Sequence, residues 1–142
     1  MREDKKEWDF IYTYTRKQSI EDGLQVEANP QTRDEAGIKY PVFLTTTVYD
    51  RYVKLPEGCE DTEDLRLWDI FTMFKHYTKV TPNVTDFLKF KVSVFIPTNI
   101  DLLPNEVIEY TNQRLVTLHA TVGALDFDDP QPSITIMLPN ED

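Results

Sequence analysis

Apolar and polar residues alternate along three stretches in the second half of the chain. Every second residue is apolar from Leu88 to Ile96, and a similar alternation runs through residues 115–122 and 133–138. A period of two is typical of strands that bury one face. The acidic segment 123–131 separates the last two stretches and is typical of a turn. The pattern therefore predicts three strands, with a turn between the last two.

One long helix is predicted in the middle of the chain. Large apolar residues, including Trp68 and Phe71, recur at helical spacing over residues 62–79. Asp61 or Thr62 can cap the start of this helix, and the acidic residues that follow suit its positive end. Because an aromatic stripe at helical spacing is what a helix packed on a sheet requires, we assign these aromatic residues to the core or its rim.

Shorter elements are predicted in the first half. Thr15 is a suitable N-cap, Pro30 suits the first turn of a helix, and Gly23 and Gly37 suit left-handed helix ends. In chain order we expect a helix over 15–23, a short strand at 24–26, a helix over 29–37, an extended segment at 39–44 and a helix that starts within 45–47.

Helices that gather early and strands that gather late predict an α+β fold. We expect an antiparallel sheet of three to four strands from the C-terminal half, with the N-terminal helices packed on one face. The length of 142 residues suits a single domain, 1–142, in which the charged residues 1–9 form a frayed tail.

Composition narrows the class of protein. No stretch reaches the roughly 18 consecutive apolar residues of a membrane span, and the charged N-terminus runs into Trp8 without a signal-peptide apolar region. We therefore expect a cytoplasmic protein. Cys59 is the only cysteine, which excludes an internal disulfide and multi-cysteine metal sites. Its acidic neighbours disfavour the negatively charged thiolate, so we interpret Cys59 as a poor nucleophile.

The charge of the chain bears on its partners. The formal net charge is −10, and beyond Lys91 a single base, Arg114, stands against eight acidic residues. Nucleic-acid affinity comes mostly from basic residues that neutralise phosphates, so we expect no direct binding to nucleic acid or to anionic membranes. We expect a protein partner instead, one that is basic or itself binds nucleic acid.

Three segments carry a longer pattern. They read Tyr14-Thr15-Arg16-x-Gln18-x-Ile20-x-Asp22-Gly23 with Glu35-Ala36-Gly37-x-Lys39-Tyr40-Pro41-Val42-x-Leu44-Thr45, then Arg66-Leu67-Trp68-Asp69, then Leu118-His119-Ala120 followed by Ile134-Thr135-Ile136-Met137-Leu138-Pro139-x-Glu141-Asp142. In order and spacing they resemble an uncharacterised family of small bacterial proteins carried on plasmids, phages and integrative elements. The resemblance covers residues 12–142, with an insertion at 99–112. It implies an accessory gene of a mobile element and no mechanism.

Common catalytic motifs are absent from the sequence. There is no glycine-rich phosphate loop, dinucleotide fingerprint or Gly-x-Ser-x-Gly, and neither histidine has the spacing of a zinc site, so we expect no cofactor. His119 lies on a predicted strand, where its imidazole could act as a general base tuned by Asp69, with Arg66 as a third member. The alternative is a histidine that fills a polar gap and donates to a backbone carbonyl.

Two other polar groups are candidate sites. The first lies at the first predicted helix and could form a recognition face: Tyr14, Arg16, Gln18 and Asp22. The alternative is that Arg16 pairs with an acid and fixes this helix to the domain. The second group could hold calcium or magnesium, or could simply form an acidic hairpin turn: Asp126, Asp128 and Asp129.

Three functional hypotheses follow. The leading one is a non-enzymatic binding or regulatory protein of a mobile element that contacts another protein through an acidic surface; its sharper form is an inhibitor that imitates the charge of DNA. The second is a small enzyme with His119 as general base. The third is a structural homodimer whose subunits meet through an exposed sheet edge or apolar patch.

Overall fold

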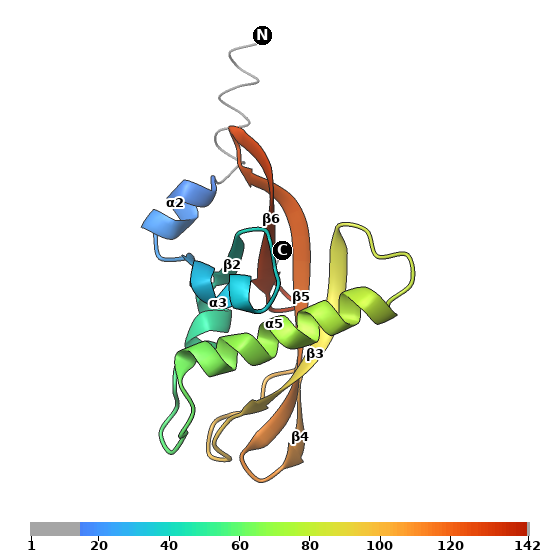
Figure 1. The fold of residues 1–142 in the computed structure, drawn as a ribbon. Coiled ribbons are helices and arrows are strands. Elements are labelled where there is room, and N and C mark those ends of the chain that lie inside the picture. The colour runs from blue at the N-terminus through green and yellow to red at the C-terminus, as the bar shows by residue number, and fades with distance from the viewer. Residues whose placement is uncertain (1–14, 142) are drawn as a thin grey trace.

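A computed structural model describes residues 15–141 of the chain. Over these residues six strands form one mixed sheet, and a long helix crosses one of its faces (Figure 1). The tail expected at residues 1–9 lies outside this range. Among the described residues, no helix combines the length and apolar character needed to cross a membrane.

The helices and strands follow one another so that two strands precede the long helix and four follow it. In chain order they are α2 (Arg16–Glu21), β1 (Gln25–Glu27), α3 (Pro30–Glu35), β2 (Val42–Thr45), α4 (Thr46–Val48), the π-helix η1 (Tyr49–Val53), α5 (Glu63–Val80), β3 (Phe87–Phe95), β4 (Glu106–Tyr110), β5 (Gln113–Asp126) and β6 (Asp129–Met137).

The sheet is centred on the long strand β5. Its neighbours run in the order β1-β2-β6-β5-β3, and β4 also pairs with β5. Residues 113–121 of β5 pair with β3 on one side. On the other side β5 pairs first with β4 and then, from His119 onward, with β6. Two strands therefore share one side of β5.

The expected sheet was incomplete, and its purely antiparallel character was wrong. β2 pairs with β6 in parallel, and β1 adds to β2, so two strands come from the first half of the chain. The reason is that all of α5, β3, β4 and β5 lie between β2 and β6 in sequence, and a pairing over that separation has no local signature. β2 also lacks alternation because its first three residues are all buried.

The core lies between α5 and the sheet. Phe71 and Phe90 are fully buried, and Phe74 meets the ring of Phe90 edge-on at 5.8 Å between centroids. Trp68 lies at the rim and is 38% exposed. The predicted helix over 62–79 is confirmed, since the Thr62 side chain accepts from the N–H of Leu65 at its start.

One expected helix lies differently. We expected the N-terminal helices on one face of the sheet, and α3 and η1 do contact α5. Arg16 of α2, however, stacks on Phe43 of β2, with 4.0 Å between its guanidinium carbon and the ring centroid. The neighbouring Leu44 belongs to the core under α5, so alternation along β2 turns Phe43 to the opposite face. α2 is therefore fastened to the face that α5 leaves open.

Candidate interaction site at the edge of β4

In the described part of the chain, three strands have a neighbour on one side only: β1, β3 and β4. An unpaired strand edge can pair with another chain, and folded proteins blunt such edges with short strands, charged residues, bulges or covering segments. β1 is only three residues long. β3 carries Lys89 and Lys91, both exposed. The shortness of β1 and the positive charges of β3 therefore disfavour pairing of these two edges with another chain.

The edge strand β4 is different. Val107, Ile108 and Tyr110 are 62%, 60% and 67% exposed. The charged residue among them, Glu109, accepts a hydrogen bond at 2.7 Å from the hydroxyl of Ser93, across the sheet on β3. The bulge between Ile108 and Tyr110 affects only the end of this edge, because Glu106, Val107 and Ile108 pair with β5 in a regular register. β4 therefore presents apolar side chains on both of its faces, and Figure 1 shows it protruding beyond the end of the sheet that α5 covers.

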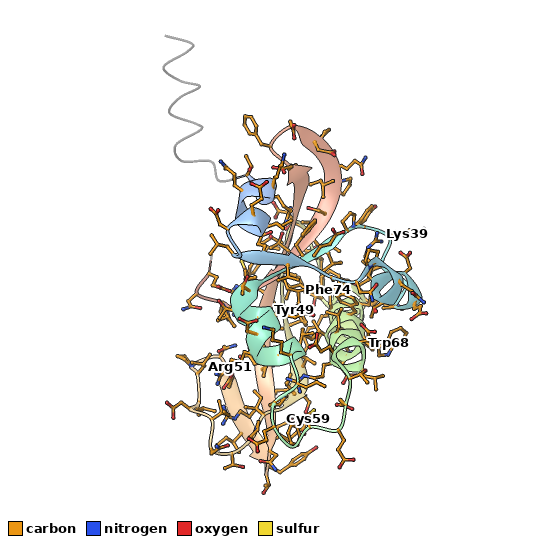
Figure 2. All side chains as sticks on the ribbon, turned by 90° about the vertical axis from the view of Figure 1, so that its left-hand side faces the viewer. Lys39, Tyr49, Arg51, Cys59, Trp68 and Phe74 are labelled. Atoms are coloured by element: carbon orange, nitrogen blue, oxygen red, sulfur yellow. The ribbon has the colours of Figure 1, made fainter. Side chains whose placement is uncertain are left out.

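Glu106, the first residue of β4, is buried in a cluster of polar groups that we call the Glu106 cluster. Its carboxylate accepts from Arg51 at 2.5 and 2.9 Å, from the hydroxyl of Tyr52 at 2.5 Å, from Arg114 at 2.8 Å and from the N–H of Leu103 at 3.1 Å. Two cations and two neutral donors thus hold one carboxylate. Figure 2 shows Arg51 beside the lower, orange part of the sheet.

The electrostatics of this cluster favour the ionised carboxylate. Burial acts to raise the pKa of Glu106, but the hydrogen bonds from Arg51, Tyr52, Leu103 and Arg114 outweigh burial and bring its pKa to about 2. Burial and the bond to Glu106 raise the pKa of Tyr52, so its hydroxyl keeps its proton. The bond to Glu106 also raises the pKa of Arg51. The first residue of β4 is therefore held in place by attraction between its negatively charged carboxylate and the positively charged guanidinium of Arg51.

One hydrogen bond shows which main-chain groups of β4 face its neighbour β5. The N–H of Thr117 donates to the carbonyl of Asn105 at 2.9 Å, so the main-chain N–H and C=O of Asn105 face β5. In an antiparallel pair these groups alternate, so those of Val107 also face β5 and those of Ile108 face outward. Within the described residues no strand pairs with that outer edge. Ile108 therefore offers both an N–H and a C=O to an added strand.

An apolar cavity of about 670 Å³ lies beside the Glu106 cluster. Arg51 and Leu103 belong to both features. The remaining walls come from the end of α2, from the segment around η1 and from the loop after β3: Gly23, Leu24, Thr46, Thr47, Asp50, Lys54, Leu55, Pro56, Ile96, Pro97 and Ile100. The cavity therefore adjoins the Glu106 cluster, but none of the residues that line it belongs to β4.

The three catalytic candidates do not share a cavity in the described structure. Arg66 and Asp69 line one of about 140 Å³. His119 lines another, of about 520 Å³, together with Lys89. The physical reason lies in strand alternation: Leu118 and Ala120 face the core under α5, so His119 between them faces the side away from the helix that carries Arg66 and Asp69.

Arg66 and Asp69 have local surroundings of their own. Arg66 is buried and donates to the carbonyl of Phe95 at 3.1 Å and to that of Arg51 at 3.4 Å. Burial lowers the pKa of Arg66. Burial and then Asp61 raise the pKa of Asp69. The contacts of Arg66 tie α5 to the end of β3 and to η1, which is a structural role.

The candidate recognition residues of the first helix are largely engaged within the fold. Arg16 donates to the carbonyl of Leu125 at 2.7 Å and to the hydroxyl of Ser133 at 2.8 Å, so it joins α2 to the β5–β6 hairpin. Burial lowers the pKa of Arg16. Gln18 completes a capping box with Thr15, and Asp22 is the C-cap of α2. Tyr14, the fourth candidate, lies outside the described residues.

The candidate metal ligands are arranged as a turn. The carboxylate of Asp126 accepts from the N–H groups of Arg16 at 3.0 Å, Lys17 at 3.1 Å and Phe127 at 2.7 Å. Asp129 accepts from the N–H of Gln131 at 3.0 Å, and Asp128 is exposed. Among residues 15–141, no three or more histidine, cysteine or acidic side chains gather so as to hold a metal ion.

Comparison of the chain with protein-family models, with curated proteins and with solved structures found no match in any of the three. The resemblance to proteins of mobile elements therefore stays a prediction. Sequence reasoning missed the β4 edge, although a signal existed: Val107 and Ile108 are adjacent apolar residues inside an otherwise polar segment.

Proposed function

We propose that this protein is a binding module that takes up a strand of a partner protein along the outer edge of β4. The observation that carries the proposal is the exposure of Val107, Ile108 and Tyr110 on a strand whose outer edge has no partner among the described residues. Main-chain hydrogen bonds would supply affinity, and the alternating side chains would supply specificity, as in other cases of strand addition.

The Glu106 cluster supports this function because it fixes the edge before a partner arrives. Arg51 from η1 and Arg114 from β5 hold the first residue of β4. A rigid edge loses less conformational entropy on binding than a loop that must first be ordered. The Glu106 cluster is a positioning device for β4.

The charge of the chain fits the same function. A net charge of −10 keeps acidic chains apart and in solution. Contact through β4 depends mainly on apolar surface and main-chain bonds, so added salt should not release the partner. Contact of a basic protein with an acidic surface, the leading hypothesis from the sequence, should weaken as salt rises. Regulation of a mobile element remains an expectation.

The test is capture of a partner from a native bacterial lysate, treated with nuclease, by the tagged protein and two variants. Val107→Lys places a charge on the edge of β4. Val80→Lys is the matched control, because Val80 is 57% exposed at the end of α5 and the substitution is the same.

We expect the unaltered protein and Val80→Lys to retain one stoichiometric protein at low and high salt, and Val107→Lys to lose it. Equal capture by Val107→Lys and the control would contradict the proposal. So would a captured protein that high salt releases from all three, because that result would indicate the acidic surface.

A further inference from the structure

We propose that the strand added to β4 is β4 of a second copy of this chain, paired antiparallel about a twofold axis at Ile108. The inference rests on the proposed function: when no other partner strand occupies the outer edge of β4, a second copy of the chain occupies it. The two sheets would join through what we call the β4 seam, formed by residues 106–110 of both copies.

The backbone of β4 permits this pairing. In an antiparallel pair about a twofold axis, a residue whose N–H and C=O face outward can exchange both hydrogen bonds with the same residue of the second copy. Ile108 is such a residue, since the bond from Thr117 to Asn105 fixes the alternation along the strand. Two bonds would therefore form at the axis itself.

The side chains match in the same register. With Ile108 on the axis, Val107 lies opposite Glu109 of the second copy, and Glu106 lies opposite Tyr110. No two like charges stand directly opposite each other, whereas like charges opposite one another destabilise a strand pair. Ile108 meets its own copy, and the exposed Val107 and Tyr110 lose solvent on both sides of the β4 seam.

On the other long edge, charge opposes self-pairing about the middle of the strand. The N–H of Val122 donates to the carbonyl of Asp86, so the outward polar groups of β3 are those of its odd-numbered residues. A twofold axis at Lys89, Phe90 or Lys91 then sets a lysine opposite a lysine. In these central registers the charges of β3 oppose a second copy, whereas those of β4 about Ile108 do not.

The β4 seam should be weak and should depend on salt in a particular direction. Five residues a side are far fewer than the roughly 20–30 of a stable interface, so we expect dissociation in the micromolar range or above. Each copy carries a charge of −10. Salt screens the repulsion between two acidic copies, so association should strengthen as salt rises.

The experiment is sedimentation equilibrium of the full chain from about 1 µM to about 1 mM, the range that includes the expected dissociation constant, at low and high salt. The variants are Val107→Glu, which sets a carboxylate opposite Glu109 of the second copy, its control Val80→Glu, and Ile108→Pro. Proline at position 108 removes an N–H that faces away from β5, and proline is tolerated on such an edge. Circular dichroism shows whether each variant is folded.

We expect the protein and Val80→Glu to pass from monomer to dimer with concentration, more readily at high salt. Val107→Glu and Ile108→Pro should weaken association at least about tenfold. A protein that stays monomeric throughout would overturn the β4 seam, while leaving the proposed function intact if Val107→Lys still loses a captured protein. Dimers that form equally well in all variants would overturn the seam and place self-association elsewhere.

Discussion

Glu106→Gln is the substitution that most directly probes how β4 is held. It keeps the size of the side chain and removes its charge. Arg51 and Arg114 would then lose their shared carboxylate, and Arg114 has only 4% of its side chain exposed. A buried cation without its partner is costly because water cannot replace the lost interaction.

Two routes give a similar magnitude for this loss. Removing one partner of a buried ion pair costs about 3–5 kcal/mol. The pKa of Glu106 falls from an ordinary value of 4.5 to about 2 in the folded chain. A difference of that size is worth about 3 kcal/mol of folding free energy at neutral pH. Since a typical domain is stable by about 5–15 kcal/mol, the substitution should remove a large fraction of the total.

The sign of the pH dependence follows from the direction of this shift. A carboxylate whose pKa is lowered by folding stabilises the fold at pH values above its pKa in the unfolded chain. This stabilisation is lost as the pH falls toward its pKa in the folded chain. The gap in unfolding free energy between the unaltered protein and Glu106→Gln should therefore be about 3 kcal/mol at pH 7 and close to half of that at pH 3.

Urea unfolding followed by circular dichroism at both pH values measures the gap. Glu109→Gln is the control, since Glu109 lies on the same strand and is exposed. We expect the control to change the unfolding free energy by about 0.5 kcal/mol or less. A Glu106→Gln protein within about 1 kcal/mol of the unaltered one at pH 7 would refute the account of the Glu106 cluster, and so would a gap that does not shrink with acid.

Two further substitutions test the packing of the fold. Phe71→Ala should cost about 3–5 kcal/mol in urea unfolding because Phe71 is fully buried, and Trp68→Ala on the same helix should cost clearly less because Trp68 is 38% exposed. Arg16→Lys should cost about 1–2 kcal/mol and speed amide exchange near the β5–β6 turn, because a lysine cannot make the several directed bonds of the guanidinium; unchanged exchange would contradict this.

Local preferences made much of the helical structure predictable. Thr15 and Thr62 cap helices where the sequence indicates, and Gly23 and Gly37 adopt positive φ after short helices. Alternation likewise predicted β3, β5 and β6. Each of these features depends on residues close together in sequence, so no knowledge of distant pairing was needed.

The sheet's other strands could not be predicted in this way. β2 is buried on both faces and pairs with β6, more than 80 positions away, so neither alternation nor proximity indicates it. β4 inverts the usual pattern, since its charged Glu106 is buried and its apolar Ile108 is exposed. A search for strands in which buried apolar residues alternate with exposed polar ones therefore does not find β4.

The candidate sites also depend on contacts between residues that are distant in sequence. Glu106 counts as surface charge in the sequence, yet Arg51 and Arg114 neutralise it in the core, and only the fold brings these groups together. His119 and Asp69 are plausible partners by residue type. They lie toward opposite faces of the sheet because the side chain of His119 points away from α5, a fact that depends on which face the helix covers.

The most direct test of the β4 edge is hydrogen exchange at single amides, measured by NMR in the monomer and in the associated state. We expect exchange of the Ile108 amide to slow on association, because its N–H faces outward in the monomer, while the outward amides of β3 at Lys89 and Lys91 exchange as before. If exchange slows along β3 or α5 and the Ile108 amide is unchanged, the partner binds elsewhere and the central claim is contradicted.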